Sequence, residues 1–141
     1  MRDALRRLND SGAFALPQGQ QVRFGIGIHG EPGRRRVKLK KANDIAEEMV
    51  AAIAGDLGGK GNALLFINGF GGTPAMELYL MYNAAARQLA KHGLAPVRAL
   101  VGSYVTSLDM AGCSITVTLL DDEAAKLWDA PVHTPALRWG M

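Results

Sequence analysis

The stretch Phe24–Gly33, which reads FGIGIHGEPG, decides how the rest of the chain can be organised. Its three large apolar residues alternate with glycines, so one face of a strand can pack while the other lets a neighbouring backbone come close. The glycines and the proline that follow His29 force the chain to turn. The pattern therefore predicts a buried strand over residues 22–28 that ends in a polar turn.

His29 stands at the carboxyl end of this predicted strand and is followed by Gly30 and Glu31. Proteins with α/β folds place their chemistry at strand ends and in the loops after them. A neutral imidazole is a nucleophile and a proton carrier near pH 7, so His29 is a candidate catalytic residue. A lone histidine in this place is more often structural, but four glycines in residues 25–33 cost backbone entropy that stability alone does not require.

Length and composition are those of one soluble globular domain. The chain has 141 residues, of which 48% are hydrophobic and 21% charged. Its single cysteine, Cys113, excludes an internal disulfide and favours a reducing compartment. The sequence has neither a run of about 18 apolar residues nor the apolar core of a signal peptide. We therefore expect a cytoplasmic protein that does not bind membranes.

Periodicity and turn residues predict alternating strands and helices along the rest of the chain. Residues 1–12 are expected to form a short helix or frayed arm, residues 12–21 a loop, and residues 13–141 one domain. Asp44 and Glu47 have capping-box spacing, and Thr73-Pro74 is a strong helix-start signal. The expected later elements are helices over 43–54, 74–92 and 121–128, and strands over 62–68, 97–105 and 113–120, with an extended tail pinned by Trp139.

Two further segments leave alternatives open. The turn Gly69–Gly72, before the second helix, is about as typical of anion binding as of close packing of strand on helix, and it lacks the Lys-Ser/Thr pair of a P-loop. The basic run Arg34–Lys41 is more typical of a solvated loop than of a nucleic-acid contact, because no aromatic residue interleaves it. No His, Cys, Asp or Glu residues have metal-ligand spacing.

Three stretches in this order resemble the dihydroxyacetone kinases, specifically the C-terminal part of their dihydroxyacetone-binding subunit. They are Phe24–Gly33, Asn68–Pro74 and Val101–Gly112, and the tail Trp128–Gly140 matches as well. The resemblance runs from about residue 14 to the end. It implies an α/β fold, a two-layer domain with a mixed β-sheet packed against helices.

The resemblance also implies a reaction. In this family the histidine that matches His29 attacks the carbonyl carbon of dihydroxyacetone and holds the triose as a covalent hemiaminal. Gly30 and Glu31 are the substrate-loop candidates beside it. The product of the whole kinase is dihydroxyacetone phosphate, and the family's binding subunits are expected to form homodimers.

Family members carry an additional N-terminal substrate domain, and a separate domain or subunit that supplies ATP with magnesium or a phosphorylated carrier. The sequence contains the motifs of neither the N-terminal substrate domain nor the donor domain. We therefore expect this chain to hold no cofactor or metal and to be catalytically incomplete alone. Its expected partners are dihydroxyacetone, a nucleotide-binding kinase domain or subunit and a second copy, without nucleic acid or membrane. The alternative is a non-catalytic binding or dimerisation module derived from this kinase subunit.

Overall fold

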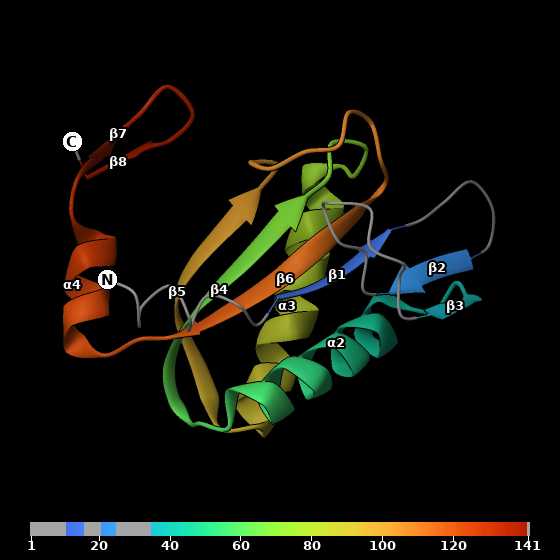
Figure 1. The fold of residues 1–141 in the computed structure, drawn as a ribbon, viewed down its shortest axis with the longest axis horizontal. Coiled ribbons are helices and arrows are strands. Elements are labelled where there is room, and N and C mark those ends of the chain that lie inside the picture. Colours follow the sequence, from blue (N-terminus) through green and yellow to red (C-terminus); the bar gives the residue numbers. More distant parts are fainter. Residues whose placement is uncertain (1–10, 16–20, 25–34, 141) are drawn as a thin grey trace.

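The computed structural model describes residues 11–15, 21–24 and 35–140. Its elements follow one another along the chain as drawn in Figure 1. In order they are β1 (Ser11–Ala15), β2 (Gln21–Phe24), β3 (Arg35–Lys38), α2 (Ala42–Leu57), β4 (Gly61–Gly69), α3 (Ala75–Lys91), β5 (Leu94–Gly102), β6 (Gly112–Leu119), α4 (Asp122–Asp129), β7 (Val132–His133) and β8 (Arg138–Trp139).

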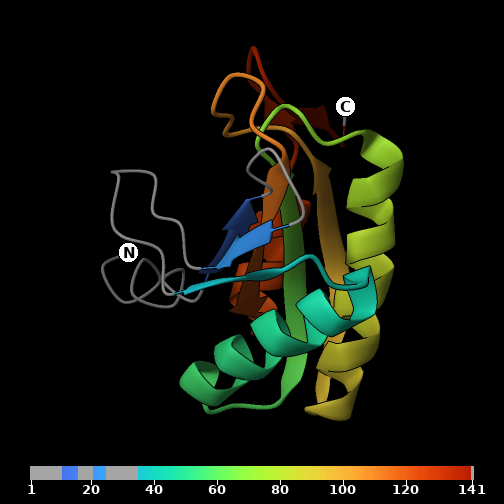
Figure 2. The same ribbon diagram turned by 90° about the vertical axis from the view of Figure 1, so that its right-hand side faces the viewer.

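Six strands form one sheet in the order β3-β2-β1-β6-β4-β5. The β4–β5 pair is parallel and the other neighbours are antiparallel, so the sheet is mixed. Helices α2 and α3 cover the same face of this sheet (Figure 2). The predicted two-layer α/β domain with a mixed sheet is thereby confirmed. None of the helices in the described ranges is long and apolar enough to span a bilayer.

The core lies between the sheet and the two helices. On β4, alternate residues Ala63, Leu65 and Ile67 are completely buried in it. Each helix turns an apolar stripe toward the sheet, and on α2 this stripe includes Ile45, Met49 and Ile53, which are all buried. Each large aliphatic side chain buried in this way stabilises the fold by roughly 1.5–3 kcal/mol relative to an exposed one.

Helix ends differ in how well local sequence predicts them. Gly93 has a φ of 78° just after α3, the left-handed conformation expected of it. The capping box is wrong: α2 starts at Ala42 after Lys41, which makes no side-chain cap, and Asp44 falls inside the first turn. There its carboxylate still complements the positive end of the helix dipole.

Two strands occupy segments that the sequence assigned to loops. Strand β1 pairs along its full length with the central strand β6, from Ser11 opposite Thr116 to Ala15 opposite Gly112. Strand β3 is built from the basic run and forms one edge of the sheet. Charged side chains are common on edge strands because they discourage pairing with another molecule. Because β1 is a strand through its pairing with the distant β6, the local pattern of apolar residues did not predict it.

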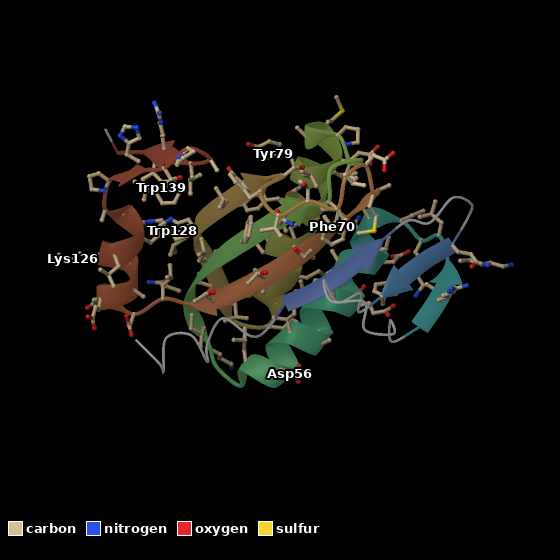
Figure 3. All side chains as sticks on the ribbon, turned by 45° about the horizontal axis from the view of Figure 1, so that its top comes forward. Asp56, Phe70, Tyr79, Lys126, Trp128 and Trp139 are labelled. Carbon is tan, nitrogen blue, oxygen red and sulfur yellow. The ribbon has the colours of Figure 1, made fainter. Side chains whose placement is uncertain are left out.

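The carboxyl-terminal segment folds beside the sheet edge. Asp121 caps α4, with its Oδ1 accepting from the Ala124 amide at 2.8 Å. The expected extended tail is a small hairpin, β7–β8, and Trp139 pins it. The Trp139 indole donates to the Ala130 carbonyl at 2.9 Å, and its ring centroid lies 5.0 Å from that of Trp128 (Figure 3).

Candidate functional site

The predicted site residues His29, Gly30 and Glu31 lie outside the described residues. The structure describes the two residues that flank the segment containing them, Phe24 and Arg35. Phe24, at the end of β2, pairs directly with Arg35, at the start of β3. Phe24 is 6% exposed and belongs to the core cluster, so one of the two anchors is held firmly.

The sheet register relates these anchors to the turn after β4. Phe24 lies opposite Phe14, Phe14 opposite Cys113, and Cys113 opposite Gly69. Neighbouring strands are about 4.8 Å apart, so three steps separate Phe24 from Gly69 by roughly 14 Å. Two of the motifs that carry the family resemblance are therefore tethered at one level of one sheet, near the carboxyl ends of β4 and β5.

Asn68 organises the loop that follows β5. Its side chain is 3% exposed, and its Oδ1 accepts from the amides of Tyr104 at 2.9 Å and Val105 at 2.8 Å. Its Nδ2 donates to the Val105 carbonyl at 2.8 Å. A buried amide at a strand end thus replaces the backbone partners that the loop lacks.

The glycine turn after β4 packs directly on the backbone of the same loop. A Cβ at Gly71, which has a φ of 116°, would collide with the Leu108 carbonyl oxygen. A Cβ at Gly72 would likewise collide with the Asp109 carbonyl oxygen. Only glycine permits this approach of the two segments.

Two of the turn's amides are already used. Phe70 N donates to the Gly112 carbonyl at 3.2 Å, and Gly72 N donates to the Met110 carbonyl at 3.0 Å. Of the two alternatives for Gly69–Gly72, this arrangement favours close packing over anion binding, because an anion would need free N–H groups.

Thr73 does not cap α3 as predicted, because the N-cap residue is Pro74. The Thr73 hydroxyl instead bridges to the start of β6. Its Oγ1 accepts from Gly112 N at 2.7 Å and donates to Gly112 O at 2.9 Å. The Thr-Pro signal located the helix correctly to within two residues and misassigned the hydroxyl.

Other titratable groups in the described part do not form a catalytic cluster. Burial raises the pKa of Cys113 to about 12, so its thiol is unreactive at neutral pH. Asp129 ends α4 and binds the Arg98 guanidinium through two contacts of 2.6 Å. This hydrogen bond, joined by the attraction of the opposite charge, lowers the pKa of Asp129. Within residues 11–15, 21–24 and 35–140, no group of His, Cys, Asp and Glu is placed to hold a metal ion.

Sequence reasoning missed two of these features. The Asn68 network and the Arg98–Asp129 pair each join residues more than 30 positions apart. The one local signal was a polar asparagine that closes an otherwise apolar strand, where burial demands hydrogen-bond partners.

Comparison with known proteins agrees with this geometry. The Dak1 domain family matches residues 8–136. The L-erythrulose 1-kinase of Mycolicibacterium smegmatis is 43% identical over 122 residues, which cover 82% of this chain and 21% of that protein. The dihydroxyacetone-binding subunit DhaK of the PEP-dependent dihydroxyacetone kinase of Escherichia coli is 36% identical over 154 residues, covering 91% of this chain and 43% of that subunit. This chain therefore spans less than half the length of these relatives.

Among solved structures, a protein described as the dihydroxyacetone kinase operon co-activator Dha-DhaQ has a TM-score of 0.78 and 30% sequence identity. The match covers 92% of this chain and 46% of that one. Relatives of this chain thus include both kinases and a co-activator.

Proposed function

The chain belongs to the Dak1 domain family as a dihydroxyacetone kinase DhaK-type domain, and from this premise we propose that it binds dihydroxyacetone covalently through His29 for phosphoryl transfer. The family match carries the proposal, because it extends over residues 8–136 and so includes His29 with its motif. The expected product of the complete kinase is dihydroxyacetone phosphate.

The proposed covalent step needs no cofactor. The lone pair of a neutral imidazole nitrogen adds to the ketone carbon, so a C–N bond forms while the C=O π bond breaks. The former carbonyl oxygen becomes a hydroxyl by taking the proton released from the other ring nitrogen, and no group leaves. A neutral imidazole is available near pH 7. Glycerol has no carbonyl and is excluded by this chemistry.

The covalent link also compensates for the small size of the substrate. A triose offers few atoms, so non-covalent contacts alone give it little affinity. A reversible bond to the His29 side chain supplies affinity and holds the terminal hydroxyl in one place for transfer. Gly30 and Glu31 would shape the substrate loop next to that bond.

The phosphoryl donor is proposed to come from another domain or subunit, as ATP with magnesium or as a phosphorylated carrier. The Escherichia coli relative is described as the dihydroxyacetone-binding subunit of a PEP-dependent kinase, a description that supports division of labour between polypeptides. A homodimer is part of the same proposal, and sedimentation velocity of the complete protein tests it.

Carbon-13 NMR of the complete protein with dihydroxyacetone labelled at its carbonyl carbon tests the central step. We expect the ketone signal to be replaced by that of a tetrahedral carbon, and His29→Ala to abolish the change. His133→Ala, on the exposed β7–β8 hairpin, is the matched control and should leave it intact. A tetrahedral signal that persists in His29→Ala would refute the role of His29.

A second candidate function is supported by the co-activator structure. In this alternative the domain binds a small carbonyl compound or a second copy as a sensor or assembly module, without phosphoryl transfer. Assay of the complete protein for dihydroxyacetone phosphate, with ATP·Mg²⁺ and with a PEP-charged carrier, separates the two. Covalent triose binding without product from either donor would favour the sensor.

A further inference from the structure

Exposed apolar side chains gather in two segments that adjoin the glycine turn. Nine large apolar side chains are exposed in the described residues, and six of them fall within 76–80 and 104–108. The start of α3 and the loop after β5 lie at the same end of the molecule (Figures 1 and 2). We call the following residues the apolar rim: Met76, Tyr79, Leu80, Val105 and Leu108.

The helical part of the rim forms one surface. Met76 lies three and four positions before Tyr79 and Leu80, a spacing that puts all three on one side of the first turns of α3. Their exposures are 83%, 59% and 51%, whereas Leu78, between them, is 1% exposed and faces the core. The helix therefore buries one apolar side and presents a second one outward (Figure 3 labels Tyr79).

Leu108 is the most exposed member of the rim, at 94%. It has a φ of 51°, and among the described residues it alone adopts a positive φ without being glycine. A β-carbon makes this conformation unfavourable, and a leucine gains nothing from full exposure to water. Strained, exposed residues of this kind persist where the surroundings force them, and they cluster at functional surfaces.

The neighbouring segments hold Leu108 in this conformation. Gly71 and Gly72 press against the carbonyls of Leu108 and Asp109, and Ser107 N donates to the Phe70 carbonyl at 2.9 Å. Asn68 holds the other half of the loop. The apolar side chain is thus presented on a fixed backbone, which reduces the ordering entropy lost when a partner covers it.

The charged residues near the apolar rim indicate which class of molecule it can bind. Within residues 61–86 and 99–112 the charged residues are Glu77 and Asp109, both acidic. Such a surface repels free phosphate, nucleic acid and anionic membranes, which bind basic patches. It suits a protein that brings apolar side chains bordered by basic ones.

Resting on the proposed function, we propose that the apolar rim docks the polypeptide that carries the phosphoryl donor. A kinase needs that donor close to the triose, and two amides of the glycine turn, those of Phe70 and Gly72, are already bonded within the domain. The rim adjoins the glycine turn that follows β4, and the sheet register places Phe24, the last described residue before the segment that contains His29, level with Gly69.

The test uses the complete protein with the donor polypeptide of its own kinase system, with affinity measured by calorimetry. Leu108→Gly removes the side chain and suits the backbone, so the fold should persist while affinity falls about tenfold or more. Met76→Ser should weaken binding similarly. Leu127→Ser, on the exposed side of α4 and outside the rim, is the matched control and should change affinity less than about twofold.

Steady-state kinetics give a second measure. Both rim variants should raise the KM for the donor polypeptide and leave kcat at saturation unchanged, while the carbon-13 signal of bound triose stays as in the unmodified protein. Unchanged donor affinity in both variants would overturn the rim and leave the His29 chemistry standing. A dimer that is lost in Leu108→Gly would assign the rim to a second copy and would also overturn the proposal.

Discussion

The side chain of Asn68 forms two hydrogen bonds with the backbone of Val105. Its Nδ2 donates to the Val105 carbonyl and its Oδ1 accepts from the Val105 amide, each at 2.8 Å. The two residues are 37 positions apart in the chain, and the asparagine side chain is buried. This one amide fixes where the strand β5 ends and the loop over residues 103–111 begins. The loop owes its shape to a residue of the neighbouring strand.

Replacing Asn68 with alanine should destabilise the domain by about 2–4 kcal/mol, because it leaves partly buried amides of the loop without acceptors. Urea unfolding gives the change in free energy, and hydrogen exchange should show faster exchange at Tyr104 and Val105. The control is Asn62→Ala on the exposed start of the same strand, expected within about 0.5 kcal/mol. Equal effects of the two substitutions would contradict the assigned role.

Two glycine-to-alanine substitutions should change the free energy of unfolding in opposite directions. Gly71→Ala places a Cβ against the Leu108 carbonyl oxygen at a positive φ and should cost more than about 2 kcal/mol. Gly55→Ala, inside α2 with open space around it, should stabilise by about 0.5–1 kcal/mol. Thermal unfolding of both variants checks the pair, and a Gly71→Ala protein as stable as the parent would rule out the close approach.

The pair of Arg98 and Asp129 should respond to pH in a defined direction. Arg98 lowers the pKa of Asp129 from its ordinary value of 3.8, so the folded state binds this proton less readily than the unfolded state. The stabilisation is therefore present above pH 3.8 and is lost as pH falls through the lower, folded-state pKa. The gap in melting temperature between the parent and Asp129→Asn should shrink over that acidic range.

An NMR titration of the Asp129 carboxyl carbon measures the same effect directly. Arg98→Gln should return the pKa upward toward the ordinary value, and added salt should do so in part because both side chains are exposed. A titration curve for Asp129 that ignores Arg98→Gln would show that the contact is absent in solution.

Cys113 should resist thiol reagents in the native state. Its side chain is fully buried in β6 and its pKa is raised to about 12, so almost no thiolate is available at neutral pH. Labelling by a maleimide should follow the rate of unfolding and accelerate in urea. A cysteine placed by Ala136→Cys in the exposed hairpin turn should react at once, and equally fast native labelling of Cys113 would argue against its burial.

Sequence patterns predicted those elements whose signals are local. The apolar run of β4 and the four-residue apolar stripe of α2 depend on residues close together, and the strand and the helix that they predict are confirmed. The mixed two-layer sheet followed from the family resemblance. The assignments of His29, Gly30 and Glu31 concern residues outside the described part and stay predictions.

The errors have a common physical cause. Strand β1 has only five residues and becomes a strand through β6, about a hundred positions later. Strand β3 is rich in basic residues because it is an edge, and no local pattern distinguishes an edge strand from a solvated loop. Thr73 was expected to serve its own helix, yet its hydroxyl serves Gly112 on another strand. In each case tertiary partners decided the outcome.

The place of β6 in the sheet has a consequence for how the protein is made. This strand joins β1, from the start of the chain, to β4, from its middle, so the first strand has no neighbour on that side until residues 112–119 exist. On the ribosome, the parallel unit of β4, α3 and β5 can assemble early, while the amino-terminal strands wait for nearly the whole domain to emerge. Truncation before Gly112 should therefore yield a product that aggregates or is degraded, although it would still encode five of the six strands of the main sheet.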